Sequence, residues 1–422
     1  MSHSEKLATD IKQMAKQAKI AARTLATLST EAKNNVLLHM VDAIDAKRQY
    51  IQNENAKDLV AGKEKGLSPA MLDRLELSDK VITSMMDGLR EVAALPDPVG
   101  EIEKMVKRPN GLMVGRMRVP LGVIGMIYES RPNVTVDAAA LCLKAGNAIL
   151  LRGGSEAIHS NRALASVLQE ALLSQGVAAE AIQVIPVTDR EAVNIMLSQE
   201  EYLDLIIPRG GEGLIRFVSE TSRIPVLKHY KGVCHIYVDR DADLEKATPI
   251  ILNSKAQRPG VCNALEGLLV HKDIAESYLP ALADSLNRAD VRLLGCKESV
   301  QIVPSITPAM DSDWGTEFLD LILCVRVVAD IDEALDYIAQ YGSQHTESIL
   351  TENYSNAQRF LAEVDASAVM VNTSTRFNDG GQLGLGAEIG ISTTKLHAYG
   401  PMGLEELTTR KFVVYGQGQV RS

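Results

Sequence analysis

Short apolar segments alternate with helix-like segments from about residue 120 onward, and this alternation constrains the fold more than any other feature of the sequence. The series opens with 120–128, a nearly continuous apolar segment. It continues with strands expected at 148–151, 182–187 and 203–207, and with helices expected at 155–173, from 190 and from 210. Strands that are apolar on both faces are typical of parallel sheets covered by helices on both sides. The sequence therefore predicts an α/β fold with a doubly wound parallel sheet.

A second α/β domain is expected after the charged segment 239–243, where the same alternation starts again. Its strands are predicted at 265–270, 321–328, 348–350 and 369–372. Residues 1 to about 100 instead show the apolar stripes of amphipathic helices, with a break at 66–69 and an end at 96–100. The chain is thus predicted to contain two doubly wound parallel-sheet domains, with a helical region at its start.

Two further segments have strand character outside these sheets. Segment 114–119 alternates polar and apolar residues at period two, as a half-exposed edge strand does. Segment 411–415 is a strand near the end of the chain, with no later strand to pair with. We therefore expect it to pair with the early ribbon or with another subunit.

Composition and charge exclude several classes of function. With 422 residues, of which 46% are hydrophobic and 23% charged, the chain is long enough for two or three domains with complete cores. The formal net charge is −10 and the basic residues are scattered, which argues against nucleic acid or an anionic membrane as a partner. No segment approaches the roughly 18–20 apolar residues that span a bilayer, and the N-terminal segment lacks the apolar core of a signal peptide. We expect a cytoplasmic protein.

The five cysteines differ in their surroundings. Cys142 and Cys324 lie in apolar runs, where a thiol packs as a small hydrophobic group. Cys234 and Cys296 each stand beside a glycine or a polar residue, and the sequence leaves their roles open. An odd number of cysteines without Cys-x-x-Cys or Cys/His spacing predicts a reducing compartment and no metal site.

Cys262 is the strongest candidate for a catalytic residue. It lies in the polar segment 253–263, after Pro259 and Gly260 and directly before the apolar strand 265–270. A loop at the start of a strand exposes the thiol and turns backbone N–H groups toward an incoming anion. A nucleophilic thiolate is therefore predicted, and a buried structural thiol is the alternative.

Two glycine-containing turns are candidates for a nucleotide site, because each follows a strand of the first domain and opens a helix. Their candidate residues are Arg152, Gly153, Ser155 and Glu156 in the first turn, and Arg209, Gly210 and Gly211 in the second. No Gly-x-Gly-x-x-Gly motif follows any strand, and strand-to-helix turns often contain glycine anyway. Glu156 would favour a free ribose hydroxyl and Arg152 an additional phosphate, so these residues leave the choice between NADH and NADPH open. Asn133, after the strand 120–128, is either an oxyanion donor or a helix cap.

These residues, taken in order, resemble the aldehyde dehydrogenase superfamily. The matching features are 120–125, Asn133, 145–147, 152–156, Asn253 and Gln257 ahead of Cys262, and Glu317 with Phe318. Within the superfamily the chain is most similar to the gamma-glutamyl phosphate reductases, on segments 128–135, 152–156, 254–263 and 341–349. The resemblance extends over nearly the whole chain.

The resemblance implies a division of the chain by role. The implied parts are a cofactor-binding domain at 1–108 and 123–239, a catalytic domain at 240–400, and a small β-ribbon oligomerisation element at 109–122 and 401–422. It also implies a homo-oligomer that reduces L-glutamyl 5-phosphate with NADPH to L-glutamate 5-semialdehyde and phosphate, through a cysteine thioester, in the second step of proline biosynthesis. Functional coupling to glutamate 5-kinase is implied as well.

The same resemblance assigns roles to individual residues. Cys262 is the implied nucleophile, and Asn133 with the backbone N–H of Cys262 is implied to stabilise the oxyanion. Glu317 joins the cofactor-binding residues as the carboxylate expected to hold the nicotinamide ribose. The candidates for substrate binding are Arg131, Lys255, Arg258, His345, Asn372 and Arg376. Asn378 and Asp379 are further candidates for the amino and carboxylate ends of the substrate.

One departure separates the chain from the hydrolytic aldehyde dehydrogenases. Those enzymes carry a Glu-Leu-Gly-Gly segment whose glutamate activates water against the thioester, whereas the corresponding segment 226–232 has no glutamate. We interpret this as favouring a reductase, since a water-activating base would hydrolyse the intermediate. A hydrolytic NAD-dependent aldehyde dehydrogenase and a catalytically silent scaffold of the same fold are the alternatives.

Overall fold

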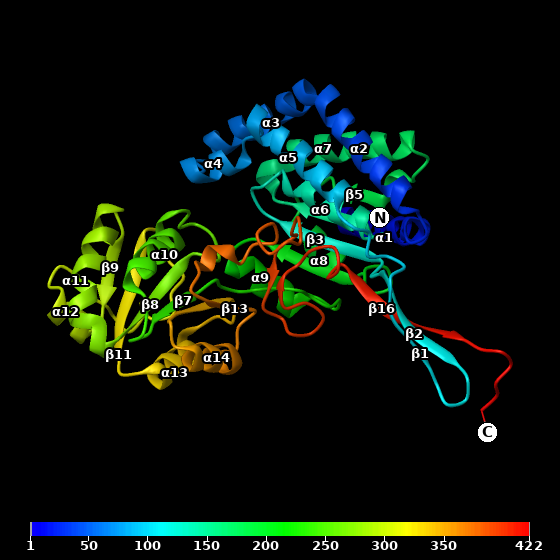
Figure 1. Ribbon diagram of the computed structural model, residues 1–422. Coiled ribbons are helices and arrows are strands. Elements are labelled where there is room, and N and C mark those ends of the chain that lie inside the picture. The colour runs from blue at the N-terminus through cyan, green and yellow to red at the C-terminus, as the bar shows by residue number, and fades with distance from the viewer. Residues whose placement is uncertain (1, 422) are drawn as a thin grey trace. The chain divides into compact units, whose positions relative to one another are not determined.

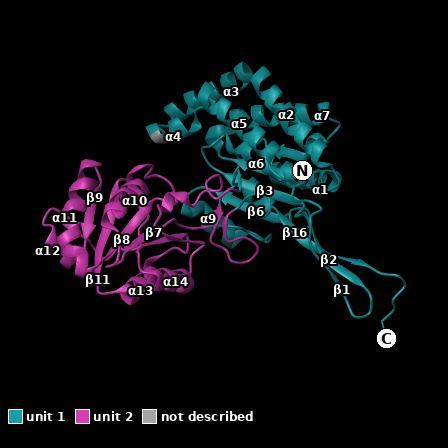
Figure 2. Cartoon of the chain, in the orientation of Figure 1, with its two compact units in different colours: residues 1–228, 385–390, 402–422 teal, residues 229–384, 391–401 magenta. Residues whose placement is uncertain are grey.

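The computed structural model describes residues 2–421, and these form two compact units (Figure 2). Unit 1 contains the chain up to residue 228, together with 385–390 and the segment from 402 onward. Unit 2 contains 229–384 and 391–401. Each unit is therefore assembled from segments that are separated in the sequence.

The helices of unit 1 begin where the sequence supplies side-chain caps. Ser2, Ser29, Ser68 and Ser78 each accept a backbone N–H in the first turn of a helix. The helices are α1 (His3–Leu25), α2 (Thr30–Ala46), α3 (Arg48–Glu64), α4 (Pro69–Leu75), α5 (Asp79–Ala94), α6 (Val134–Lys144), α7 (Ile158–Ser174), α8 (Glu191–Leu197) and α9 (Glu212–Thr221), with short 3-10 turns at Ser155–Ala157 and Ala179–Ala181. Helices α6 and α7 pack against the sheet, and α2, α3 and α5 pack on them as a further layer (Figure 1).

The sheet of unit 1 is parallel and has the strand order β5-β4-β3-β6. Its strands are β3 (Val123–Tyr128), β4 (Ala148–Gly153), β5 (Ile182–Val184) and β6 (Leu205–Arg209). All residues of β3 and β4 are buried, as the apolar segments of the sequence predict. The strand order reverses between β3 and β6, and the carboxyl ends of strands at such a point form the usual ligand-binding crevice of this architecture.

An antiparallel ribbon extends from unit 1 (Figure 1). It consists of β1 (Ile102–Lys107), β2 (Met113–Pro120) and β16 (Thr408–Tyr415), with β2 in the middle. The prediction that the C-terminal strand pairs with the early ribbon is confirmed, because Thr408–Tyr415 runs antiparallel to all of β2. Strand β1 lies inside the segment 1–108 that was assigned to the cofactor-binding domain, yet its partner is β2 of the ribbon. The division of the chain by role stays a prediction.

Unit 2 is built on a seven-stranded parallel sheet with the order β10-β9-β11-β8-β7-β12-β13. The strands are β7 (Cys234–Val238), β8 (Leu265–His271), β9 (Arg292–Gly295), β10 (Thr307–Pro308), β11 (Ile322–Val328), β12 (Thr346–Leu350) and β13 (Ala368–Val371). The helices are α10 (Leu244–Ala256), α11 (Lys272–Arg288), α12 (Lys297–Ile302), α13 (Ile331–Tyr341) and α14 (Tyr354–Glu363), with a 3-10 turn at Thr375–Phe377 and a small pair of strands, β14 (Ile391–Ser392) and β15 (Gly400–Pro401).

The central strand of unit 2 is the one that follows the Cys262 loop. All seven residues of β8 are buried, and Leu265, Leu268 and Val270 join a core that also includes Ile251 and Leu279. The predicted strands of the second domain correspond to β8, β11, β12 and β13. The two parallel sheets and the ribbon are thus confirmed. Among residues 2–421, no helix is both long enough and apolar enough to cross a bilayer.

Candidate active site

Cys262 lies in the loop that connects α10 to β8 in unit 2 and is partly exposed. A turn closed by Ala264 N donating to Val261 O, at 3.1 Å, fixes the loop just before the strand begins. Cys142 and Cys324 are buried, as predicted, and burial raises the pKa of both thiols, to about 12 for Cys324. Accessibility therefore distinguishes Cys262 from these two cysteines.

The segment before β7 runs directly against the Cys262 loop. A Cβ added to Gly232 would lie 2.0 Å from the carbonyl oxygen of Cys262 and 2.6 Å from its Cα. Only glycine permits such an approach of two backbones. The N–H of Gly232 donates to Glu317 Oε1 at 2.9 Å, which places the predicted cofactor carboxylate beside the same loop. Gly232 thus joins the Cys262 loop to Glu317.

Two imidazoles lie beside the Cys262 thiol. One ligand atom each from His229, Cys262 and His345 lies within 4.8 Å of the other two, and the two imidazole rings meet edge to face with centroids 5.5 Å apart. His229 Nδ1 lies 2.8 Å from the carbonyl oxygen of Ile391, which can only accept, so Nδ1 carries the proton and Nε2 is the acceptor of the neutral ring. The arrangement places two imidazoles within 4.8 Å of the thiol.

Cys234 supports this cluster from inside the unit. Its thiol donates to the carbonyl oxygen of Cys262 at 3.2 Å and lies 3.7 Å from His345 Nδ1. Burial raises the pKa of the Cys234 thiol well above its usual value, so it stays protonated. His345 Nδ1 also lies 2.7 Å from the Thr346 hydroxyl. Cys234 therefore has a structural role, which the sequence left open.

A buried ion pair lies beneath the loop. Lys255 Nζ and Glu266 Oε2 are 2.7 Å apart, and both side chains are almost completely excluded from solvent. Burial lowers the pKa of Lys255 and raises that of Glu266 to about 7. Burial thus disfavours the ionised form of both side chains. Glu266 also accepts the N–H of Leu319. The structure thus places the ammonium of Lys255, a predicted substrate ligand, inside the unit.

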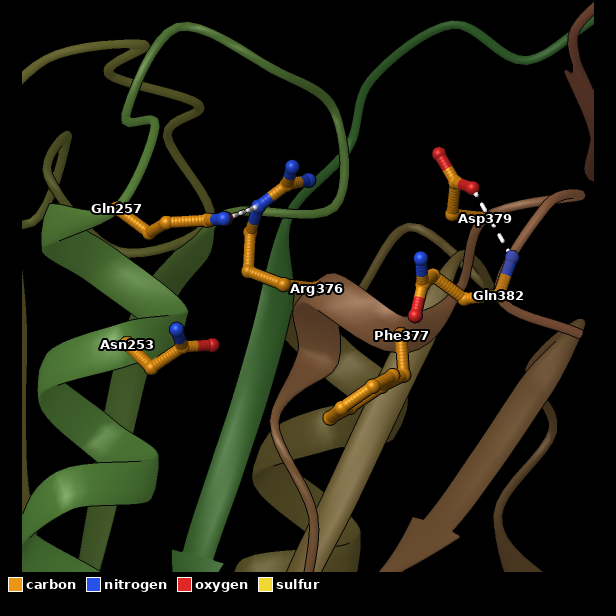
Figure 3. Close-up of a pocket in the computed structure, with 6 residues that line it drawn as sticks. All are labelled: Asn253, Gln257, Arg376, Phe377, Asp379 and Gln382. Carbon is orange, nitrogen blue, oxygen red and sulfur yellow. Dashed lines mark hydrogen bonds between the residues drawn. The ribbon is translucent and has the colours of Figure 1, made fainter.

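Arg376 lines a pocket of about 320 Å³ in unit 2 (Figure 3). The residues around it are Asn253, Gln257, Arg376, Phe377, Asp379 and Gln382. Arg376 Nε donates to Gln257 Oε1 at 2.9 Å. Burial lowers the pKa of Arg376, and the like charge of the exposed Arg258 lowers it further. The buried amide of Asn263, next to Cys262, donates to the carbonyl of Asn378 at 2.9 Å and so ties the pocket to the Cys262 loop.

Asn372 lies apart from this group. Its side-chain amide accepts from Thr351 N and donates to Thr351 O, both at 2.8 Å. It stands after β13, at the carboxyl edge of the sheet, whereas Cys262, His345 and Glu317 precede β8, β12 and β11 at the amino edge. The structure therefore does not bring Asn372 to the Cys262 loop. Its side chain instead joins the end of β13 to Thr351, the residue after β12.

The predicted residues of unit 1 gather at the carboxyl edge of its sheet, after β3, β4 and β6. Glu156 accepts from the backbone N–H and the hydroxyl of Ser130, at 2.5 and 2.8 Å, and this joins the loop after β4 to the loop that holds Arg131. Asn133 occupies the N-cap position of α6, but its side chain makes no cap hydrogen bond and donates to Asp137 at 3.0 Å instead.

The two glycine-containing turns differ in how open they are. The Arg152 guanidinium is mostly buried and donates to the carbonyl oxygens of Gly153 and Thr188, at 3.0 and 3.2 Å, so it shapes its own loop. Gly211, after Arg209 and Gly210, has no atom within 4 Å of the position that a Cβ would take. Its N–H donates to Glu129 Oε2 at 3.0 Å, which shows that the start of α9 accepts a negatively charged oxygen.

Comparison with known proteins accounts for this arrangement. The profile of the aldehyde dehydrogenase family matches residues 2–319, about three quarters of the chain. The chain belongs to the aldehyde dehydrogenase family. It is 66% identical to the gamma-glutamyl phosphate reductase of Desulfotalea psychrophila over 96% of this chain and 97% of that protein. It is 60% identical to the gamma-glutamyl phosphate reductase of Geotalea daltonii over 98% of this chain and 99% of that protein.

A solved structure gives the same result for the fold of this aldehyde dehydrogenase family member. The crystal structure of gamma-glutamyl phosphate reductase from Thermotoga maritima matches with a TM-score of 0.96 and 49% identity, over 98% of this chain and 100% of that one. The predicted fold and the resemblance to these reductases are confirmed, and the chain is an oxidoreductase of this family. The roles of individual residues stay predictions.

Sequence reasoning missed three residues of the aldehyde dehydrogenase site: His229, Gly232 and Cys234. Two of them lie in 226–232, where the missing glutamate was the only signal. The structure places His229, from this segment, beside the thiol. The closeness of Gly232 to Cys262 has no local signature, because the contact joins two separate segments.

Proposed function

We propose that this chain reduces L-glutamyl 5-phosphate to L-glutamate 5-semialdehyde and phosphate with NADPH, through a thioester on Cys262, in the second step of proline biosynthesis. The names of the close relatives support the reaction. The observation that carries the mechanism is the cluster of a partly exposed thiol with two imidazoles. A thiol with a base in reach is the usual arrangement for an attack on an acyl group.

The first half of the reaction is a transfer of the acyl group to sulfur. Nε2 of His229 accepts the thiol proton, and the Cys262 thiolate attacks the acyl carbon. The C–S bond forms, the bond from the acyl carbon to the phosphate oxygen breaks, and the imidazolium gives its proton to the departing phosphate. His229 occupies the segment where hydrolytic relatives carry their glutamate, so a poised water-activating carboxylate is missing from 226–232.

The second half is a reduction. Bound NADPH would supply a hydride to the thioester carbon. The aldehyde would be released as the C–S bond breaks, and the electrons of that bond would return to Cys262, which would take a proton from solution. The residues that we assign to the cofactor are those of the two turns, Arg152–Glu156 and Arg209–Gly211, and Glu317. The N–H of Gly211 donates to the Glu129 carboxylate, so a cofactor phosphate at this turn would have to replace that carboxylate. The choice of NADPH rests on the resemblance to the reductases.

The pocket beside the Cys262 loop offers groups of both signs. Arg376 and Asp379 line the same cavity, and an α-amino acid substrate carries a carboxylate and an ammonium group. We assign Arg376 to the carboxylate and Asp379 to the ammonium group, with Arg258 as a further cation for the phosphate. The assignment of Asn133 to the oxyanion stays a prediction, since Asn133 lies in unit 1 and Cys262 in unit 2.

The reverse reaction tests the proposal. The protein is incubated with L-glutamate 5-semialdehyde and NADP⁺ while inorganic phosphate is varied, and NADPH formation is followed. We expect turnover to depend on phosphate and to produce L-glutamyl 5-phosphate. Turnover that needs no phosphate and yields glutamate would identify the hydrolytic alternative. Equal inertness of Cys262, Cys142 and Cys324 toward iodoacetamide at neutral pH would identify a silent scaffold.

The ribbon supports the remaining part of the proposal, a homo-oligomer. Phe412, Val414 and Tyr415 of β16 are 67%, 55% and 60% exposed, and Val106 of β1 is 49% exposed. An exposed apolar sheet of this kind is typical of an interface between subunits. We further propose a cytoplasmic enzyme that is functionally coupled to glutamate 5-kinase, the source of an acyl phosphate of this class.

A further inference from the structure

We propose that His229, Cys262 and His345 form a binding site for Zn²⁺, and that occupancy of this site reversibly blocks the thiol. Thiolate sulfur and imidazole nitrogen are the ligands that Zn²⁺ prefers in proteins. The three ligand atoms lie within 4.8 Å of one another, and all three residues belong to unit 2. The absence of a metal-binding motif in the sequence does not argue against this site, because its ligands come from three separate segments.

The distances fit a zinc site after a small closure. Zinc bonds of about 2.0–2.3 Å in a tetrahedron hold neighbouring ligand atoms about 3.3–3.8 Å apart. The observed upper limit of 4.8 Å therefore requires an approach of about 1 Å. The side chains of His229 and Cys262 are partly exposed, so both can make this adjustment and the ion has a path into the site.

The surroundings orient the imidazoles as metal sites do. His229 Nδ1 donates to the carbonyl oxygen of Ile391 at 2.8 Å, which leaves Nε2 as the nitrogen that would bind the ion. His345 Nδ1 lies 2.7 Å from the hydroxyl of Thr346, which in turn accepts from Asn378 Nδ2 at 2.8 Å. Outer hydrogen bonds of this kind fix the ring orientation and the tautomer of metal-binding histidines. These hydrogen bonds thus orient both imidazoles in the absence of an ion.

Three protein ligands leave a fourth position for water, and the ion would hold the sulfur as a thiolate. Coordination to Zn²⁺ withdraws electron density from the thiolate and places the ion next to the sulfur, where an acyl group would have to approach, so attack on an acyl carbon is suppressed. Binding does not depend on the proposed function, whereas the inhibition does. Inhibition should be relieved by a chelator, since no covalent bond to carbon is formed.

Direct metal binding tests the site. The full-length protein is treated with a chelator and titrated with Zn²⁺ against a chromophoric chelator, and Co²⁺ is added separately to detect the absorption of a tetrahedral thiolate complex. We expect one ion per chain, with at least a tenfold weaker Kd for His229→Gln and for Cys262→Ser. His345→Gln should show the same effect if its circular dichroism is unchanged. Cys296→Ser, which removes another partly exposed thiol, is the matched control and should bind as the wild type does.

The outcomes separate the metal site from the catalytic proposal. Binding of Zn²⁺ should protect Cys262 from iodoacetamide and abolish phosphate-dependent turnover, and a chelator should restore both. If neither His229→Gln nor Cys262→Ser changes the affinity, or if the wild type binds less than one ion per chain, the zinc site is refuted and the catalytic proposal stands. If the ion binds and protects the thiol while turnover continues, Cys262 is not the nucleophile and the zinc site stands.

Discussion

Substitution of Gly232 by alanine provides the sharpest test of the site geometry. The new Cβ would lie 2.0 Å from the carbonyl oxygen of Cys262, whereas real Cβ atoms essentially never approach another atom within 3.0 Å. The contacting atoms of Cys262 belong to its backbone and not to a flexible side chain. The two backbones must therefore separate by about 1 Å to accommodate the new Cβ. A displacement of this size at a reacting centre costs about 100-fold in rate. We expect kcat for Gly232→Ala to fall by about that factor.

The displacement can be measured without turnover. The rate at which iodoacetamide alkylates Cys262 should also change in Gly232→Ala, because the thiol moves away from His229. Gly260→Ala is the matched control in the same loop, since its Cβ would meet nothing closer than Leu319 O at 3.7 Å, an ordinary contact. This variant should keep both rates within a few-fold of the wild type.

Two results would refute this reasoning. Wild-type kcat in Gly232→Ala would mean that the contact between the two backbones is unimportant for the chemistry. An equal loss of kcat in Gly260→Ala would mean that the loop tolerates no alanine, so that the close approach at Gly232 explains nothing. Circular dichroism of both variants separates either outcome from a failure to fold.

Three further predictions concern the ion pair, a buried acid and the ribbon. Lys255→Met should lower the free energy of unfolding of unit 2 by about 3–5 kcal/mol, since it leaves the buried Glu266 carboxyl without its cationic partner, and adding Glu266→Gln should restore part of this in denaturant titrations. Burial raises the pKa of Asp137 from 3.8 to about 6, so its stabilising contribution is present below pH 4 and is lost as the pH rises through 6. Asp137→Asn should therefore increase the free energy of unfolding by up to about 3 kcal/mol at pH 8 and by about half of that at pH 5, and an equal gain at both values would exclude burial as the cause. Phe412→Asp with Val414→Asp should reduce the sedimentation coefficient if the ribbon joins subunits, and an unchanged value would exclude this interface.

The strands of both sheets were predictable because burial on both faces leaves a clear signal. Residues of β3 and β8 are all apolar or small except Glu266 and His271, and a short run without a polar face is typical of a buried strand. Strands β7, β9 and β10 were missed. The five buried residues of β7 lie directly before the charged segment 239–243, after which the second domain was expected to begin, and β9 and β10 have only four and two residues. Short strands at the edge of a sheet carry too few side chains to show a period.

The candidate site was predictable only in part. Cys262 was found from its loop, because a thiol between Pro259–Gly260 and a buried strand is a local pattern. His229 was not, since its closeness to the thiol depends on where the sheet brings β7 and β8 together. The burial of Lys255 was also beyond the sequence, because its partner Glu266 lies on a strand that is otherwise mostly apolar. The roles of His229 and Lys255 thus depend on contacts between segments that are separated in the sequence.

The carbonyl of Ile391 that orients His229 has a consequence for biosynthesis. These two residues are 162 positions apart, and Ile391 belongs to a short segment that returns to unit 2 after the chain has already left it. A ribosome therefore exposes the thiol long before the imidazole beside it can be anchored. The His229 imidazole therefore gains this anchor only after Ile391 has been synthesised and the segment 391–401 has joined unit 2.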